Sequence, residues 1–379
     1  MSETVFTLSR GFLPTTDPLK QLPKAFSEWE TIAAQLPKLL MTDQCRNRIS
    51  SLPDFPIHQL KSSAEHERAM LILSFLGHAF VWGALPHATQ IPSNLAKPWC
   101  ELGNILQRPA VLSYASYALH NWYRLDPKRP VELGNIALLQ NFFGGMDEEW
   151  FILIHIDIEA KIAPALQILL SAQDAAANND LKQLLNDVLK IKTGLFAICE
   201  TLDRMPEKCD PYIYYNRVRP YIHGWKNNPA LPNGLIYDGV DHNQPKFFRG
   251  ETGAQSTIIP SMDAVLGITH ETDDLRVYLQ EMRDYMPDEH RAFLSKLEQN
   301  KSIRDCVIKH QESHLDLREA YNTCVDLIVR FRMTHLKYAA TYIHQQSQHV
   351  DNSTAVGTGG TPFMRYLKKH EVESERFKI

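Results

Sequence analysis

The sequence predicts an all-α protein with two domains. Apolar residues recur at steps of three and four over long stretches, and alternation with a period of two is nearly absent. A chain of 379 residues is also long enough for two hydrophobic cores. We therefore expect a large helical bundle around an interior that suits a cofactor, with a smaller, mostly helical N-terminal domain.

The predicted elements can be followed along the chain. Prolines punctuate the first forty residues, so only short helices are expected there. Helices are then predicted over 64–83, 95–106, 112–125 and 133–142. Segment 141–145 interrupts the pattern with two glycines, so we place a domain boundary there, between 1–143 and 144–379. Longer helices are predicted beyond it, over 147–172, 180–203, 212–222, 261–266, 274–285, 288–300 and 315–346. A polar loop at 346–360 is expected to be mobile.

Composition argues against several classes of function. A net charge of −4 offers no basic footprint for nucleic acid. The chain does not begin with a basic-then-apolar signal pattern. The most apolar segment, 150–170, contains charged residues and is not expected to cross a membrane. Two of these, Asp157 and Glu159, are interpreted as polar positions on the outer face of a helix. Six scattered cysteines indicate reduced thiols in a cytoplasmic protein.

Two histidines occupy apolar helical faces. His335 continues a face that steps through Tyr321, Cys324, Ile328, Phe331, Tyr338 and Tyr342. A buried imidazole needs a partner, and a hydrogen-bonded core histidine is a commoner explanation than a metal ligand. His155 lies on a second such face, with Phe151 and Ile158. Two inward imidazoles suit a haem, which needs one axial histidine, but two unrelated core histidines remain the alternative.

Three further segments are candidates for binding. Tyr214, Tyr215 and Arg219 can share a helical face, and a guanidinium beside aromatic rings suits an aromatic carboxylated substrate. An arginine stacked on surface tyrosines is the alternative. Segment 247–256 has small residues that allow close approach to a flat ligand, although it also fits a plain helix-entry loop. Segment 357–361 lacks the lysine of a phosphate-binding loop and better suits a lid that brings a hydroxyl to substrate.

Taken in order, segments along nearly the whole chain resemble the indoleamine 2,3-dioxygenase family, haem enzymes that open the indole ring of tryptophan. The matching segments are Arg10-Gly11-Phe12-Leu13-Pro14, Ala79-Phe80-Val81-Trp82-Gly83, Asn121-Trp122, Gly224-Trp225-Lys226, Ala254-Gln255-Ser256, Tyr285-Met286-Pro287, Leu317-Arg318-Glu319-Ala320-Tyr321 and Gly357-Thr358-Gly359-Gly360-Thr361. The resemblance implies a haem b cofactor with one iron, and L-tryptophan or a related indole and O2 as substrates. It also implies that the small domain covers the distal side of the haem. We expect a monomer or weak oligomer, with no nucleic-acid or membrane partner.

The resemblance also implies roles for individual residues on the haem. His335 would be the proximal ligand of the iron. Arg332 and Asp263 would form the supporting ion pair near the haem edge. Gly253 and Ala254 would pass beside the haem on its distal side, where glycine allows a close approach.

On the substrate side, the resemblance assigns Arg219 to the carboxylate and Thr358 to the ammonium and carboxylate end. The residues expected around the indole ring are Tyr114, Phe151, Tyr214, Tyr215, Thr252 and Gly253. The chain departs from the animal enzymes in having His155 where they have serine, and Glu251 and Thr252 where they have glycine and serine. Our hypothesis is that His155 accepts the indole N–H, with contact to O2 as the lesser option.

The more polar pocket leaves the identity of the indole open, because a buried polar group needs a partner. A hydroxylated indole is one option. Two other functions also remain open from the residues alone. One is a haem protein that senses or stores O2 or NO, which has no use for Arg219 together with Thr358. The other is an indole mono-oxygenase of the same family.

Overall fold

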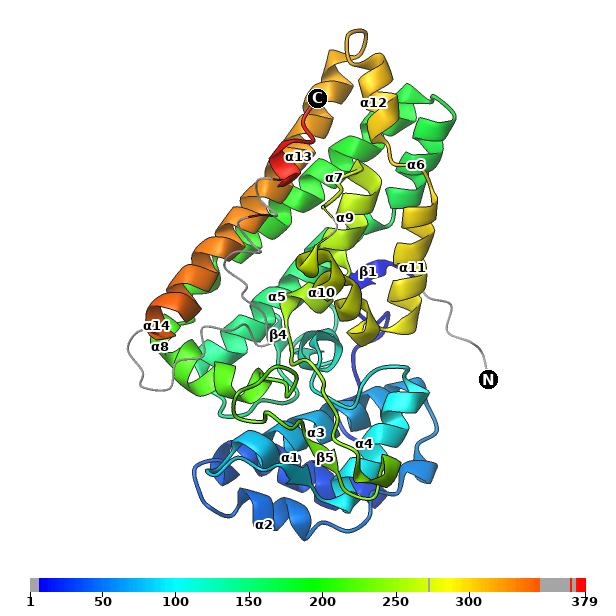
Figure 1. The fold of residues 1–379 in the computed structure, drawn as a ribbon. Coiled ribbons are helices and arrows are strands. Elements are labelled where there is room, and N and C mark those ends of the chain that lie inside the picture. The colour runs from blue at the N-terminus through cyan, green and yellow to red at the C-terminus, as the bar shows by residue number, and fades with distance from the viewer. Residues whose placement is uncertain (1–6, 272, 348–368, 370–372) are drawn as a thin grey trace.

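A computed structural model describes residues 7–271, 273–347, 369 and 373–379 of the chain. Helices dominate it, and its strands are only two to four residues long, so the all-α prediction is confirmed. The three longest helices, α5, α7 and α13, lie in the upper part of the molecule in Figure 1, and helices α1–α4 lie in the lower part.

The lower part of the molecule comes mostly from the first 140 residues. Its helices are α1 (Ser27–Leu39), α2 (Cys45–Ser50), α3 (Ser63–Trp82), α4 (Ser93–Ile105) and the π-helical turn η3 (Ala115–Leu119). A capping box starts α3, because Ser62 accepts from the amide of Glu65 and the Glu65 carboxylate accepts from the amide of Ser62. Strand β2 (Gln90–Ile91) pairs in parallel with β5 (Ile236–Tyr237), which returns from much later in the chain.

The upper part is a helical bundle. Its helices are α5 (Met146–Leu166), α6 (Leu169–Ala177), α7 (Leu181–Asp203), α9 (Ile258–Leu266), α10 (Asp274–Met282), α11 (Asp288–Gln299), α12 (Arg304–His310) and α13 (Leu315–Tyr338). Helix α7 packs against α5 on one side and α13 on the other. Strand β1 (Ser9–Phe12) lies along α5, so the start of the described chain belongs to this upper part (Figure 1). A π-helical segment, η10 (Ala339–His344), and α14 (Gln345–Ser347) continue α13.

Two clusters of buried apolar side chains form the core. The first lies among α1–α4 and includes Trp29 and Trp99, and the second lies among α5, α7 and α13. Trp225 and Tyr237, from the second half of the chain, belong to the first cluster. The division at residue 143 therefore stays an interpretation of the sequence, and the chain crosses between the two clusters more than once.

Two predicted helices are wrong. Within 112–125 only η3 is helical, and the segment 133–142 contains no helix. Both segments instead contribute to the antiparallel pair β3 (Tyr123–Arg124) and β4 (Ile136–Ala137). The buried Asn121 side chain donates to the Gln140 carbonyl and accepts from the Gln140 amide at 2.8 Å each. Side-chain hydrogen bonds thus satisfy a buried irregular backbone, and burial alone produced the helix-like spacing.

Two other predicted helices are interrupted. The expected helix over 147–172 ends at Leu166, shortly after Pro164, and α6 begins at Leu169. The expected helix over 212–222 is divided into α8 (Pro211–Ile213), the π-helical η5 (Tyr214–Val218) and the 3-10 helix η6 (Arg219–Ile222). Pro164 lies in the last turn of α5 and Pro220 lies in η6, and each lacks one amide of an α-helical ladder.

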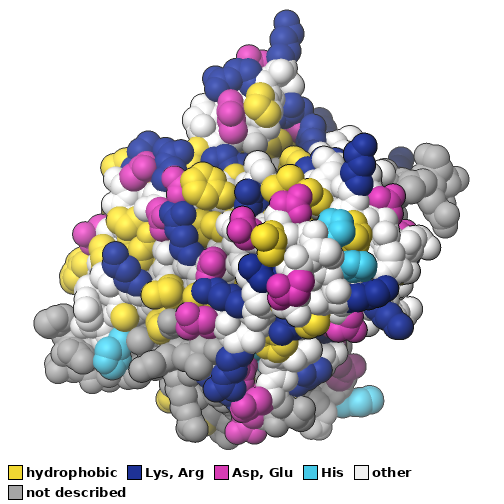
Figure 2. Space-filling view, turned by 90° about the horizontal axis from the view of Figure 1, so that it is seen from above, with side chains coloured by type: hydrophobic (Ala, Val, Ile, Leu, Met, Phe, Trp, Pro, Cys, Tyr) yellow, Lys and Arg dark blue, Asp and Glu magenta, His cyan; other side chains and the backbone are white. Residues whose placement is uncertain are grey.

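Among the described residues, no helix is both long and apolar enough to span a bilayer. Figure 2 shows one face of the molecule, on which basic, acidic and apolar side chains are intermingled. The described side chains on that face form no continuous basic patch.

Candidate active site

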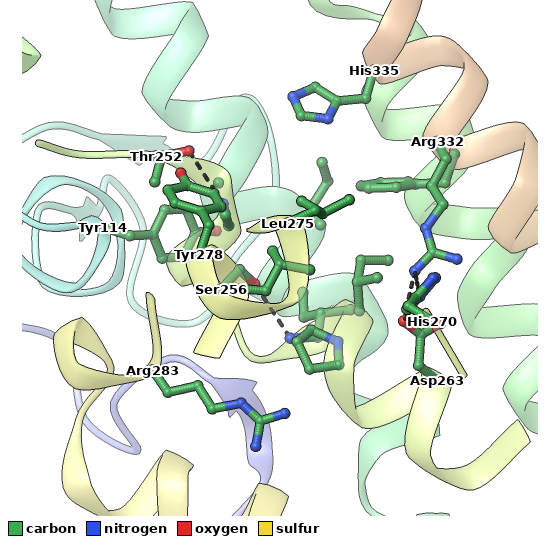
Figure 3. A pocket seen from close by; sticks show the side chains of 18 of the residues that line it. Tyr114, Thr252, Ser256, Asp263, His270, Leu275, Tyr278, Arg283, Arg332 and His335 are labelled. Carbon is green, nitrogen blue, oxygen red and sulfur yellow. Dashed lines mark hydrogen bonds and ion pairs between the residues drawn. The ribbon is translucent and has the colours of Figure 1, made fainter. Parts of the chain in front are cut away.

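A cavity of about 950 Å³ lies inside the upper bundle, between α5, η5, α9, α10 and α13. Figure 3 labels side chains that line it from α9, α10, α13 and the loop that precedes α9. Ten residues singled out from the sequence line it together: Tyr114, Phe151, His155, Tyr214, Thr252, Gly253, Ala254, Asp263, Arg332 and His335. Most of its lining is apolar, as expected for a site that takes a flat hydrophobic group.

His335 lies near the C-terminal end of α13, and its imidazole points into the cavity (Figure 3). The ring has exposed surface, but that surface faces the cavity, and burial in the protein lowers its pKa to about 4. The imidazole is therefore neutral at pH 7 and keeps a nitrogen lone pair. Its side chain makes no hydrogen bond to any residue that the structure describes. The core-histidine alternative required such a partner, so this geometry favours the ligand interpretation.

His155 approaches the same cavity from α5. Its Nδ1 lies 2.7 Å from the Phe151 carbonyl oxygen, one turn earlier. Burial lowers the pKa of His155, and the bond to the Phe151 carbonyl only partly opposes this. A neutral ring that donates from Nδ1 carries its lone pair on Nε2. His155 thus offers a hydrogen-bond acceptor to the cavity.

Three π-helical segments surround the cavity, and each places a tyrosine on its wall. Tyr114 directly precedes η3, Tyr214 begins η5 and Tyr342 lies within η10. The ring centroids of Tyr214 and Tyr342 are 5.8 Å apart, and those of Phe151 and Tyr214 are 4.7 Å apart. A π-helical turn widens the helix and re-aims its side chains, and such turns are frequent at functional sites. The spacing of apolar residues did not predict these segments.

The loop at 250–256 is held in place by a close backbone crossing. A Cβ on Gly224 would lie 2.2 Å from the Gly250 amide nitrogen, so the two strands of chain meet only because both residues are glycine. Gln255 fixes the loop further, since its amide donates to the Gly250 carbonyl and accepts from the Tyr114 amide. Gly253 has no atom within 4 Å of its Cβ direction, so the loop leaves open space there.

Two carboxyl groups of α5 are buried, although both had been predicted, wrongly, to lie on its outer face. Glu159 and Asp157 are fully buried, rather than on an outer face, because β1, α7 and the segments around η3 cover α5 on several sides. The Glu159 carboxyl accepts from the Tyr114 hydroxyl at 3.0 Å and the Ser256 hydroxyl at 2.9 Å. Burial raises its pKa to about 7, although these two hydrogen bonds lower it.

Glu251 lines the cavity itself and is 3 % exposed. Burial raises the pKa of its carboxyl to about 8, so this group is mostly protonated at pH 7. Its charge, when present, raises the pKa values of Tyr114, Tyr117 and Tyr214, which places it among these rings. A neutral carboxylic acid can donate one hydrogen bond and accept others.

Arg332 and Asp263 form the ion pair that the resemblance implied, with 2.6 Å between Nη2 and Oδ2. Burial raises the pKa of Asp263, but Arg332 and His270 hold it below its ordinary value. His270 had not been singled out from the sequence. It lies on a loop after α9, where neither periodicity nor a motif marks it.

Two predicted site residues do not line the cavity. The Arg219 guanidinium lies over the Tyr215 ring, 5.3 Å from its centroid, and both side chains are buried. This arrangement resembles the alternative of an arginine stacked on tyrosines, except that the pair lies in the interior rather than on the surface. Their substrate-binding roles stay predictions. Thr358, with the rest of segment 357–361, lies outside the described residues.

The cavity fits a haem on several grounds. It is largely apolar, an imidazole without a hydrogen bond to the described chain enters it from α13, and a charged cluster closes one end. A neutral imidazole is the form that binds iron. The carboxylate groups of a haem also need a cationic side chain at the edge of the cavity. The residues present therefore match the donor set that haem b requires.

The comparisons with known proteins agree with this geometry. A family model described as "Indoleamine 2,3-dioxygenase" matches residues 3–377. The chain is 36% identical to indoleamine 2,3-dioxygenase 1 of Rattus norvegicus over 365 residues, which covers 93% of this chain and 89% of the relative. It is 34% identical to indoleamine 2,3-dioxygenase 2 of Homo sapiens, in an alignment that covers 94% of this chain and 90% of the relative. A 6-hydroxytryptophan 2,3-dioxygenase of Fusarium equiseti is 31% identical, in an alignment that covers 96% of this chain and 94% of the relative. The chain belongs to the indoleamine 2,3-dioxygenase family.

Proposed function

We propose that the dioxygenase reaction of this protein takes place in the cavity between His335 and His155, on a haem b whose iron is bound by His335. The substrates are L-tryptophan or a related indoleamine, and O2. The observation that carries this proposal is the neutral His335 imidazole, which projects into an apolar cavity without a hydrogen bond to the described residues. The chain belongs to a family of dioxygenases. This membership argues against a haem protein that only senses or stores O2 or NO, an alternative that the sequence alone left open.

The bound haem supplies the activation of O2, and the protein supplies position and electrostatics. Tyr114, Phe151 and Tyr214 wall the space for the indole ring and exclude water from it. The His155 Nε2 accepts a hydrogen bond from the indole N–H, and this bond fixes the indole ring in one orientation. Arg219 is assigned to the substrate carboxylate by resemblance only, because its guanidinium lies over the Tyr215 ring and neither residue lines the cavity.

The test is replacement of the proposed ligand. His335→Gly should lose most of its bound haem, because the iron loses its only protein ligand in this proposal. Added imidazole should restore part of the haem absorbance, since it can occupy the vacated space. His310→Gly is the matched control, because His310 lies on α12, away from the cavity. Full haem content in His335→Gly would refute the assignment.

Glu251 supports a second candidate substrate, an indoleamine with a hydroxyl on its benzene ring. A protonated acid among Tyr114, Tyr117 and Tyr214 can donate a hydrogen bond to such a hydroxyl or accept one from it. The Fusarium equiseti relative is named for a hydroxylated tryptophan, so the family includes this chemistry. We expect Glu251→Gly to lower kcat/KM for hydroxytryptophans relative to L-tryptophan. An unchanged ratio would leave L-tryptophan as the better candidate.

A further inference from the structure

Five side chains form a buried charged cluster at one end of the cavity, which we call the C-terminal corner. They come from α9 (Asp263), the loop after it (His270), α13 (Arg332) and the end of the chain (Glu373 and Ser374). Figure 3 shows Arg332, His270 and Asp263 grouped on one side of the cavity, below His335. These three residues line the cavity, and Glu373 and Ser374 contact them from behind.

The contacts within the C-terminal corner form a continuous network. His270 bridges two carboxylates, with Nε2 at 3.3 Å from Asp263 Oδ2 and Nδ1 at 2.7 Å from Glu373 Oε2. Arg332 donates from Nη2 to Asp263 at 2.6 Å and from Nη1 to the Ser374 hydroxyl. The plane of the guanidinium is therefore set from two directions, by Asp263 and by Ser374. A planar guanidinium fixed in this way keeps its other N–H groups in one orientation.

Burial makes these contacts interdependent. The side chains of Arg332 and Glu373 are each 6% exposed, and those of Asp263 and His270 are 14% and 13% exposed. A charge left without its partner in such a place is costly, because little water reaches it. Lys369 also forms an ion pair with Glu373, with 3.3 Å between Nζ and Oε1. Glu373 and Ser374 thus contribute to holding the pair that faces the cavity.

The end of the chain is anchored on its outer side as well. The Asn322 side chain, on α13, donates to the Ile379 carbonyl at 2.7 Å and accepts from the Ile379 amide at 2.8 Å. Lys378 forms an ion pair with Asp326 on the same helix. These contacts lie away from the cavity and secure residues 373–379 to the helix that contains His335 and Arg332.

We propose that His270, Glu373 and Ser374 are positioning residues for the haem. They hold Arg332 where the cavity receives the carboxylate groups of the cofactor, so haem retention depends on Glu373 and Ser374 as well as on His270. This inference depends on the proposed haem-binding function. A guanidinium already held in place binds a carboxylate without losing further side-chain entropy, which favours a long-lived complex.

The test measures the rate at which the haem-loaded full-length protein loses haem to an excess of a high-affinity haem acceptor. The double variant Glu373→Gln/Ser374→Ala should lose haem about tenfold faster than the wild type, and His270→Gln should act in the same direction. Lys378→Met is the matched control, since it removes an ion pair of the same segment outside the cavity. Its haem loss should stay within about twofold of the wild type.

A second readout separates positioning from general stability. The thermal unfolding midpoint of the haem-free protein measures how much general stability each variant loses, and only the double variant should also shift the reduction potential of the bound iron. Equal haem-loss rates in the wild type and both corner variants would overturn the inference. The inference would also be overturned if Lys378→Met lost haem as fast as the double variant, because residues 373–379 would then affect haem retention only through general stability. A wild-type protein that takes up no haem would instead refute the proposed function.

Discussion

Replacement of His155 tests the substrate side of the cavity most directly. Because its Nδ1 donates to the Phe151 carbonyl, its Nε2 presents a lone pair to the cavity, and its lowered pKa keeps the ring neutral at pH 7. A hydrogen bond between neutral groups contributes about 0.5–1.5 kcal/mol net, so its loss should weaken indole binding about two- to tenfold. Haem content should not change, since the iron ligand in our proposal is His335.

The assay compares L-tryptophan with 1-methyl-L-tryptophan, which lacks the indole N–H. Substrate affinity is read from the shift of the haem absorbance band, and KM from formation of the N-formylkynurenine product. The wild type should prefer L-tryptophan about two- to tenfold more strongly than His155→Ala does. His155→Leu fills more of the vacated space but cannot accept a hydrogen bond, so agreement between the two variants assigns the effect to the lost acceptor.

The pH dependence has a defined sign. Nε2 can accept only while the ring is neutral, and burial lowers the His155 pKa below its ordinary 6.5. Affinity for L-tryptophan should therefore not change through titration of His155 between about pH 6.5 and 8, and should fall on acidification through the lowered pKa. If the preference for the N–H substrate is the same in the wild type and both variants, His155 does not contact the indole nitrogen.

Three other predictions concern the loop and the buried acids. In the wild type, KM for L-tryptophan should rise above about pH 8 as Glu251 ionises and draws water into the cavity; Glu251→Gln should abolish this rise, and its persistence would exclude Glu251 as the cause. Glu159 has a raised pKa of about 7, so it favours folding at low pH and this contribution is lost as pH rises from 4.5 through 7. Urea unfolding at pH 5 and 8 should show about 2–3 kcal/mol less pH dependence for Glu159→Gln, whereas equal dependence would contradict the assignment. Gly224→Ala should lower the free energy of unfolding by at least about 2 kcal/mol, because its methyl group would collide with Gly250, while Gly253→Ala should change it little.

Much of the helical frame could be read from the sequence. The steps of three and four predicted helices close to α3, α4, α7, α11 and α13 because each buries one apolar stripe or is buried throughout. The same steps failed at 112–125 and 133–142, where apolar residues are buried in irregular chain. Periodicity reports which residues are buried, and only the hydrogen bonds of the backbone decide whether burial occurs in a helix.

The sequence by itself determined that His335 and His155 each lie on an apolar helical face, and its ordered motifs indicated the family. Only the tertiary structure decided what surrounds those rings. It brought Glu159 inside, against the expectation of an outer face, because neighbours cover α5 on several sides. It also brought His270 to Glu373, 103 residues later in the chain. No local pattern encodes such a contact, because charge pairs between distant segments form only once packing has excluded water and set their distance.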